Sequence, residues 1–183
     1  MVPAGYMAKR VVAKPHWLPA ERVSSIYSVS GCISENFTDY IGFWKHNGYW
    51  LFDTPEAIIE IARANNIDLA ATVLFFYDVY ELQFDGGEWT PFAPESSFRT
   101  NVSVPENKVF EGYDVVTFTV QTSPECSPLS CNALASEVDT NTRCLVQSFE
   151  RARALLENGT FDNSEPGPYR VFAVYSVAWP VAV

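Results

Sequence analysis

The chain has 183 residues, of which 48% are hydrophobic and 15% aromatic, which is enough apolar surface for one folded domain and too much for a disordered chain. Its 22 acidic and 12 basic residues give a net charge of −10. This charge disfavours nucleic acid and anionic membranes as partners, because both are bound mainly through Lys and Arg. The sequence contains no run of about 18 apolar residues, so we expect no membrane-spanning helix.

The first 22 residues predict an arm rather than a folded element. They contain three prolines and four basic residues, and they lack the apolar core of a signal peptide. We expect residues 1–22 to be flexible or docked on the surface, and residues 23–183 to form a single domain. Without a secretory signal the expected location is cytoplasmic, where the four cysteines would be free thiols.

Helices are predicted from apolar residues at helical spacing and from their end signals. One predicted helix contains the stripe of Phe37, Ile41 and Trp44. The others span residues 54–65, residues 145–158 and a short stretch at 132–138. The second helix begins with Thr54 and Pro55, because proline at the first helical position gives up no needed N–H. Gly159 ends the helix over 145–158.

Strands are predicted where aromatic and β-branched residues dominate, at 24–30, 72–84, 113–120 and 169–178. Asp85, Gly86 and Gly87 then predict a hairpin to a short return strand over 89–92. Strands and helices do not alternate regularly, and no internal repeat is visible in the sequence. We therefore predict a single-domain α+β fold, with a mixed, mostly antiparallel sheet of about five strands and three or four helices packed on it.

A proline-rich loop with Cys126 and Cys131 is the most unusual local feature. It joins a predicted strand to the short helix at 132–138, which would place Cys131 at a helix N-terminus and lower the pKa of its thiol. In the simplest interpretation both cysteines pack as small apolar side chains. In a second they form a redox pair, although the spacing is not Cys-x-x-Cys.

Two further interpretations give this loop a chemical role. A zinc site would combine Cys126 and Cys131 with ligands from elsewhere in the chain, namely Cys32, Cys144 or His46. Alternatively, Cys131 is the nucleophile of a transferase or hydrolase, with His46 as its base and Asn132 or nearby backbone N–H groups holding an oxyanion. The sequence contains no glycine-rich nucleotide-binding motif, and we expect no cofactor.

Acidic and aromatic residues gather between Arg63 and Arg99, where the sequence has six acidic residues and no basic one. Aromatic side chains ringed by acids are typical of surfaces that bind a basic protein, because opposite charges steer association. The candidate contact residues are Asp78, Tyr80, Glu81, Asp85, Glu88 and Trp89. We therefore favour an acidic protein-binding or inhibitory module that docks on a basic protein. A cysteine-dependent enzyme and a small zinc site are the alternatives.

Overall fold

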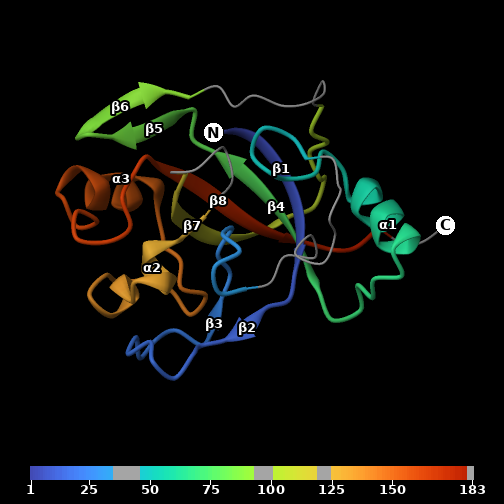
Figure 1. The fold of residues 1–183 in the computed structure, drawn as a ribbon, viewed down its shortest axis with the longest axis horizontal. Helices are drawn as coiled ribbons and strands as arrows, with labels where there is room; N and C mark the ends of the chain where they lie inside the picture. The colour runs from blue at the N-terminus through green and yellow to red at the C-terminus, as the bar shows by residue number, and fades with distance from the viewer. Residues whose placement is uncertain (35–45, 93–100, 119–124, 181–183) are drawn as a thin grey trace.

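The computed structural model describes residues 1–34, 46–92, 101–118 and 125–180. They form the predicted α+β fold, in which helices pack on a six-stranded antiparallel sheet (Figure 1). The strands of this sheet are β1 (Val2–Lys9), β4 (Val73–Val79), β5 (Leu82–Asp85), β6 (Glu88–Pro91), β7 (Val109–Thr117) and β8 (Tyr169–Val177). The other elements are the paired short strands β2 (Val12–Ala13) and β3 (Ser25–Ile26), the helices α1 (Pro55–Ala64), α2 (Pro128–Cys131) and α3 (Phe149–Glu157), and a 3₁₀ turn, η2 (Leu134–Ser136).

β8 is the central strand, as its apolar sequence predicts. It pairs with β4 and then with β5 along one edge, and with β7 along the other. β1 extends the sheet beyond β4, and β6 extends it beyond β5. Six of the nine residues of β8 are buried, so this strand is covered on both faces for most of its length.

The structure corrects the prediction of an N-terminal arm, because residues 2–9 form β1, an edge strand of the sheet. β1 pairs with β4, with Val2 opposite Val79 at one end and Lys9 opposite Val73 at the other. The last six residues of β1 are buried. Prolines and basic residues pointed to an arm, but the partner strand of β1 lies more than sixty residues further along the chain and gives no local signal.

Local chemistry explains the elements that were predicted well. Thr54 caps α1 by accepting a hydrogen bond from the Ala57 N–H, and Ile58 and Ala62 of this helix are buried. The β5–β6 hairpin turns at Gly86 and Gly87, whose φ angles of 55° and 88° are the positive values that this tight turn requires.

Three other predictions need new boundaries, and a fourth cannot be compared. The strand expected at 24–30 is reduced to Ser25–Ile26, and the one expected at 72–84 is interrupted between β4 and β5. The helix expected from residue 145 begins only after Ser148, whose hydroxyl caps the Arg151 N–H. The stripe of Phe37, Ile41 and Trp44 lies outside the described residues.

An internal repeat, which was not visible in the sequence, organises the sheet. The N-terminal half runs β1, α1, β4 and the C-terminal half runs β7, α3, β8, and in each half the two strands pair antiparallel. The halves meet where β4 pairs antiparallel with β8. This order is the one that a two-fold axis between β4 and β8 would produce, and α1 and α3 lie at opposite ends of the molecule (Figure 1).

An asparagine builds the turn before the helix in each half. The Oδ1 atoms of Asn47 and Asn141 each accept hydrogen bonds from the N–H groups two and four positions later. Their Nδ2 groups each donate to a carbonyl of the first strand of the same half. The residue three positions after each asparagine has a left-handed backbone conformation, with φ 58° at Trp50 and 65° at Cys144. The two turns therefore share their hydrogen bonds and their backbone conformation.

A glycine lets each turn approach the first strand of its half. Gly5 and Gly112 have φ angles of 136° and 142°, and each marks a register shift in its strand. A Cβ atom at Gly5 would lie 2.7 Å from the Phe52 carbonyl oxygen, and one at Gly112 would lie 2.7 Å from the Leu145 Cβ. Only glycine fits both the space and the conformation at these two positions.

Candidate functional site

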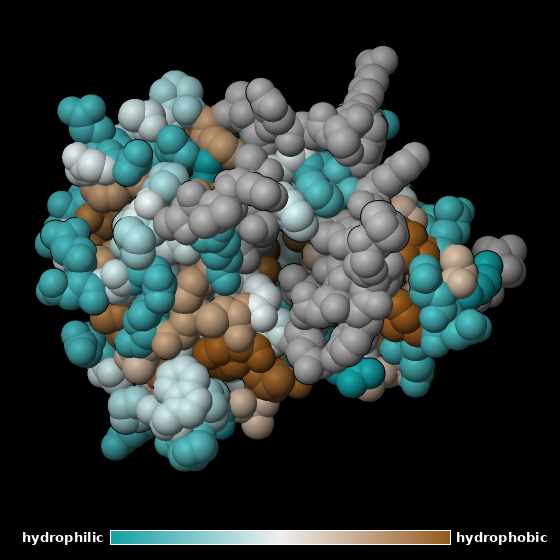
Figure 2. Space-filling model, viewed as in Figure 1, coloured by the Kyte–Doolittle hydropathy of each residue, from teal (hydrophilic) through white to brown (hydrophobic). Residues whose placement is uncertain are grey.

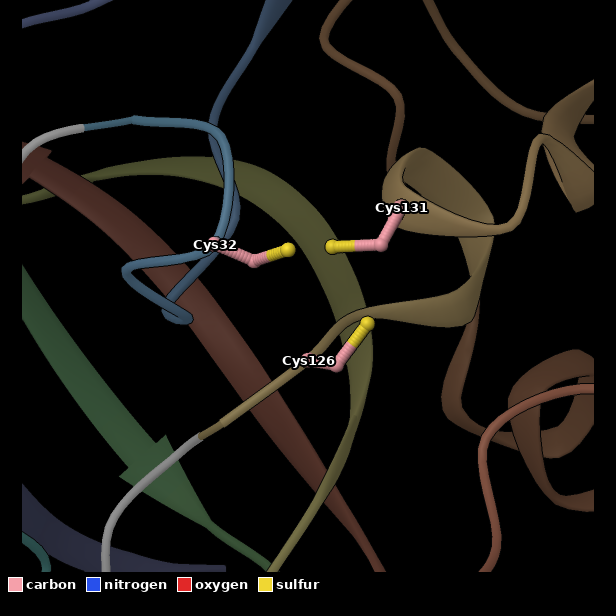
Figure 3. Close-up of side chains that lie close together, drawn as sticks. All are labelled: Cys32, Cys126 and Cys131. Atoms are coloured by element: carbon pink, nitrogen blue, oxygen red, sulfur yellow. The ribbon is translucent and has the colours of Figure 1, made fainter.

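Three of the four cysteines meet although they are far apart in the sequence. Cys32 follows β3 in the N-terminal half, Cys126 lies between β7 and α2, and Cys131 is the last residue of α2. Their Sγ atoms all lie within 4.8 Å of one another, and the side chains point toward a common centre (Figure 3). Cys126 is buried, Cys131 is half-buried and Cys32 is exposed, so the cluster reaches from the interior to the surface.

Asp114, a buried carboxylate on β7, ties together the two loops that carry these thiols. In the loop before Cys32, its Oδ2 accepts hydrogen bonds from the Ser28 hydroxyl at 2.7 Å and the Val29 N–H at 2.9 Å. In the loop before α2, its Oδ1 accepts a hydrogen bond from the Ser127 hydroxyl at 2.6 Å. One side chain therefore sets the spacing between a loop of the N-terminal half and a loop of the C-terminal half.

Lys9 adds a buried positive charge to this network. Its side chain lies in the interior, and its Nζ donates hydrogen bonds to the carbonyl oxygens of Ser28 and Ser30. Burial raises the pKa of Asp114, whereas its three hydrogen bonds and the charge of Lys9 act in the opposite direction. The loop that leads to Cys32 is thus held from two sides by oppositely charged groups.

The neighbouring thiols make Cys131 the most acidic of the three. Its pKa falls to about 6, chiefly because the Cys126 thiol donates a hydrogen bond to the Cys131 thiolate, with further contributions from Cys32, the Ser127 N–H and the Ser130 hydroxyl. The pKa of Cys32 rises to about 11, because its thiol is partly desolvated although the residue is exposed, and because its hydrogen bond to Cys131 holds its proton. The pKa of Cys126 rises because its hydrogen bond to Cys131 holds its proton. At neutral pH the cluster therefore holds one thiolate and two thiols.

The predicted position of Cys131 at a helix N-terminus is wrong. α2 ends at Cys131, and Pro128 begins this helix because proline suits the first helical position. Ala133 then adopts a left-handed conformation, with φ 59°, which separates α2 from η2. The low pKa of Cys131 therefore comes from neighbouring groups and not from a helix dipole.

Cys144, the fourth cysteine considered for a zinc site, lies outside the group of three. It is buried in the Asn141 turn, at the left-handed position that Trp50 occupies in the N-terminal half. Burial raises the pKa of its thiol to about 12. Its place in the repeat gives it a role in packing.

His46 and Asn132, proposed as base and oxyanion donor, lie in different surroundings. The His46 ring stacks on Trp50 with centroids 4.0 Å apart, and its Nδ1 lies 2.7 Å from the Asn47 carbonyl oxygen. Asn132 lies beside the thiol cluster, with its Oδ1 3.8 Å from the Cys126 Sγ. Among the described residues, the groups that lower the pKa of Cys131 are thiols, an N–H and a hydroxyl, and do not include an imidazole.

The acidic residues of the predicted protein-binding surface are divided between two environments. Glu81, Asp85 and Glu88 are exposed on or beside the β5–β6 hairpin. Asp78 lies within β4 and forms an ion pair with Lys108, with 2.9 Å between Oδ2 and Nζ. Figure 2 shows hydrophilic residues gathered over the end of the molecule that β5, β6 and α3 form. Three of the four predicted acids are thus accessible to a partner.

The two predicted aromatic contacts pack within this surface. The rings of Tyr80 and Trp89 meet edge to face with centroids 5.4 Å apart, and the Trp89 Nε1 donates to the Glu157 carboxylate at 2.8 Å. A surface pocket of about 610 Å³ lies next to them, between the hairpin tip and the end of α3. Its lining includes the acidic residues Asp85, Glu157 and Asp162, of which Glu157 forms an ion pair with Arg153, with 2.6 Å between Oε1 and Nε.

Asp114 and Lys9 were not singled out from the sequence. The sequence feature that could have identified Asp114 is its position as a lone acidic residue in the apolar run 113–120. An ionised group in a buried strand needs buried partners. Its partners come from segments more than ten and more than eighty residues away, which no local pattern reveals.

Within the described residues, no helix is long and apolar enough to cross a membrane. Comparison with protein families, with curated proteins and with solved structures finds no match for the chain. The function is therefore inferred from the arrangement of the residues themselves.

Proposed function

We propose that the protein binds a thiophilic divalent cation, Zn²⁺ in the first place, through Cys32, Cys126 and Cys131. The observation that carries this proposal is the convergence of their three Sγ atoms within 4.8 Å. Cysteine thiolates are preferred ligands of zinc and poor ligands of Mg²⁺ and Ca²⁺. Apolar packing alone gives no reason for three sulfur atoms from two loops to face one point, with one of them exposed.

The spacing of the sulfur atoms suits a tetrahedral zinc ion. A Zn–S distance of about 2.3 Å in a tetrahedron places two sulfur atoms about 3.8 Å apart. Separations of up to 4.8 Å between the sulfur atoms therefore have to shrink by only about 1 Å. Because Cys32 is exposed, its side chain has room to make this adjustment.

The protonation of the cluster also favours a cation. Cys131, with a pKa of about 6, already supplies a thiolate at neutral pH, whereas Cys32 and Cys126 have raised pKa values and carry protons. Zinc deprotonates the thiols that coordinate it. Binding at neutral pH therefore releases two protons, and the affinity for zinc is expected to rise with pH.

Titration of the reduced protein with Zn²⁺ against a chromophoric chelator tests this proposal. We expect one zinc ion per chain, and we expect the variants Cys32→Ser, Cys126→Ser and Cys131→Ser each to weaken binding by at least about tenfold, since each removes one of three ligands. Cys144→Ala is the matched control, because it removes a buried thiol outside the cluster. Failure of the wild type to retain zinc, or an equal loss in Cys144→Ala, would contradict the proposal.

The acidic hairpin supports a second candidate function, docking on a basic protein. The acid-lined pocket beside Asp85 favours it, because a concave site with several carboxylates suits the Lys or Arg side chain of a partner. The exposed Glu81 and Glu88 would extend the same negative field around that pocket. This surface lies on the hairpin and α3, so it does not depend on the thiol cluster.

An oligo-lysine peptide serves as the probe for this second function. We expect binding that weakens steeply with salt, and a loss of about tenfold or more when Asp85 and Glu88 are both replaced by Lys. The control variant replaces Glu56 and Glu60 by Lys, which makes the same charge change on exposed positions of α1. Equal losses in the two variants would show a response to net charge alone and would remove the docking proposal.

A further inference from the structure

A buried arginine lies on β8 without an ion-pair partner among the described residues. Arg170 is 2% exposed, and its Nη2 donates a hydrogen bond to the Gln83 Oε1 at 2.7 Å. Its Nε and Nη1 have no hydrogen-bond partner among the described residues, and no carboxylate of these residues forms an ion pair with it. Of the five N–H donors of a guanidinium, the three on Nε and Nη1 therefore have no acceptor in the part of the chain that the structure describes.

Aromatic side chains surround this guanidinium. Its Cζ lies 3.1 Å from the ring centroid of Phe92 and 4.2 Å from that of Phe118. Tyr49 lies within electrostatic range, and its ring packs against Phe92. Rings placed over a guanidinium interact with the faces of the cation, but they leave the N–H groups at its edge without acceptors.

Three residues near the guanidinium reach the surface. Gln83, which accepts its hydrogen bond, and Phe92 and Tyr49 are each half-buried, so part of each side chain remains in contact with solvent. Burial lowers the pKa of Arg170 to about 9, which still leaves it charged at neutral pH. The chain therefore holds a cation that is removed from water and not neutralised by a carboxylate of the described residues.

We propose that Arg170 is the anchor of a binding site for the carboxylate of a small organic acid. A carboxylate is planar and matches two N–H groups at the edge of a guanidinium, so it can accept two hydrogen bonds in the plane of the guanidinium. A tetrahedral phosphate needs more room above and below that plane. The apolar rings of Phe92 and Phe118 would contact the organic body of the ligand.

A purely structural role predicts different behaviour. A buried charge that only supports packing can be replaced by an apolar side chain of similar length with little loss or even a gain of stability. The molecule would then show no saturable response to carboxylates. The proposed site is independent of the thiol cluster and of its metal, so either proposal can fail without the other.

Calorimetric titration and thermal melting of the full chain, with sodium benzoate, acetate and phosphate at constant ionic strength, test this site. We expect benzoate to bind saturably and to raise the melting temperature, with acetate weaker and phosphate weakest. Arg170→Met should abolish the effect, and Arg170→Lys should weaken binding about tenfold or more, because it keeps the charge and loses the planar fork.

Arg143→Met is the matched control for this experiment. Arg143 also lies over an aromatic ring, 4.4 Å from the centroid of Tyr27, but it donates to the Ser25 hydroxyl and lies 3.9 Å from the Glu111 carboxylate. This variant should keep the benzoate response. Phosphate binding more tightly than benzoate, or an unchanged response in Arg170→Met, would overturn the proposal.

A second measurement avoids the need for a folded variant. In wild-type protein labelled with ¹⁵N-arginine, benzoate should shift the Nε–H resonance of Arg170 and leave that of Arg143 in place. A static Arg170 resonance under saturating benzoate would overturn the proposal whatever the stability of Arg170→Met.

Discussion

The two halves of the chain share one scaffold and differ in what they add to it. Both have a glycine in the first strand, an asparagine turn, a capped helix and a second strand that pairs with the first. The equivalent glycines, Gly5 and Gly112, make Met7 the counterpart of Asp114. Only the C-terminal half therefore places a carboxylate at this position, and only its loop contains two cysteines. The repeated features build the sheet, and the unrepeated ones build the site.

The difference also explains how Cys32 reaches the other two thiols. Asp114 accepts hydrogen bonds from the loop of each half, so a residue of the C-terminal half positions the loop of the N-terminal half. Met7, an apolar side chain, offers no such acceptor. The site is thus shared between the halves, and its assembly depends on one buried carboxylate.

The largest effect is expected from Asp114→Asn. It removes the buried negative charge beside Lys9 and weakens the acceptor for both loops, so the free energy of unfolding should fall by about 3 kcal/mol or more. Urea denaturation of the metal-free protein at neutral pH measures it. The control, Met7→Leu at the equivalent position, should cost less than about 1.5 kcal/mol because it conserves volume and polarity. Comparable losses in the two variants would break the contrast between the halves.

Thiol reactivity provides the next contrast, between Cys131 and Cys32. At pH 7 the pKa values of about 6 and about 11 favour the Cys131 thiolate strongly, although a more acidic thiolate is intrinsically less nucleophilic. The balance predicts roughly 50-fold faster alkylation of Cys131 by iodoacetamide in the reduced, metal-free protein. Its rate should rise through pH about 6 and then level off. Mass mapping that found the exposed Cys32 modified first would contradict this order.

The glycines test whether the halves are equivalent as scaffolds. Gly5→Ala and Gly112→Ala each place a Cβ in a forbidden conformation and against neighbouring atoms, so each should lower the free energy of unfolding by about 2 kcal/mol or more. Gly86→Ala, at the open hairpin tip, should cost about 1 kcal/mol because only the conformational strain applies. Thermal and chemical denaturation measure these losses. A large difference between Gly5→Ala and Gly112→Ala would contradict the equivalence of the two halves.

The helix caps should give the smallest and most similar effects. Thr54→Ala and Ser148→Ala each remove one hydrogen bond to the first turn of a helix, which costs about 1 kcal/mol. Double-mutant analysis should show the two losses to be additive, because α1 and α3 lie at opposite ends of the molecule. A double variant whose loss differs strongly from the sum of the two single losses would contradict the view that α1 and α3 pack independently.

Sequence inspection predicted the features that short-range chemistry determines. Thr54 with Pro55 located α1, and Gly86 with Gly87 located the hairpin, because a cap and a positive φ each require particular residues. β1 was missed because its identity depends on pairing with β4, far along the chain. The repeat was missed because the halves share hydrogen bonds and glycine conformations more than residue identities.

The site was predictable to a similar extent. Cys126 and Cys131 stood out because they share one loop, and the zinc alternative already included Cys32. The sequence could not separate Cys32 from Cys144, since both are distant from the loop. The structure separates them through Asp114, which holds the Cys32 loop at the cluster, while Cys144 fills a position of the repeated turn.

The sulfur coordination of zinc bound to the wild-type chain tests the central claim most directly. X-ray absorption at the zinc edge should show three sulfur atoms at about 2.3 Å in a complex of one zinc per chain, one from the N-terminal half and two from the C-terminal half. A bound zinc ion with two or fewer sulfur neighbours would contradict the account. Failure of the chain to bind zinc would contradict it as well.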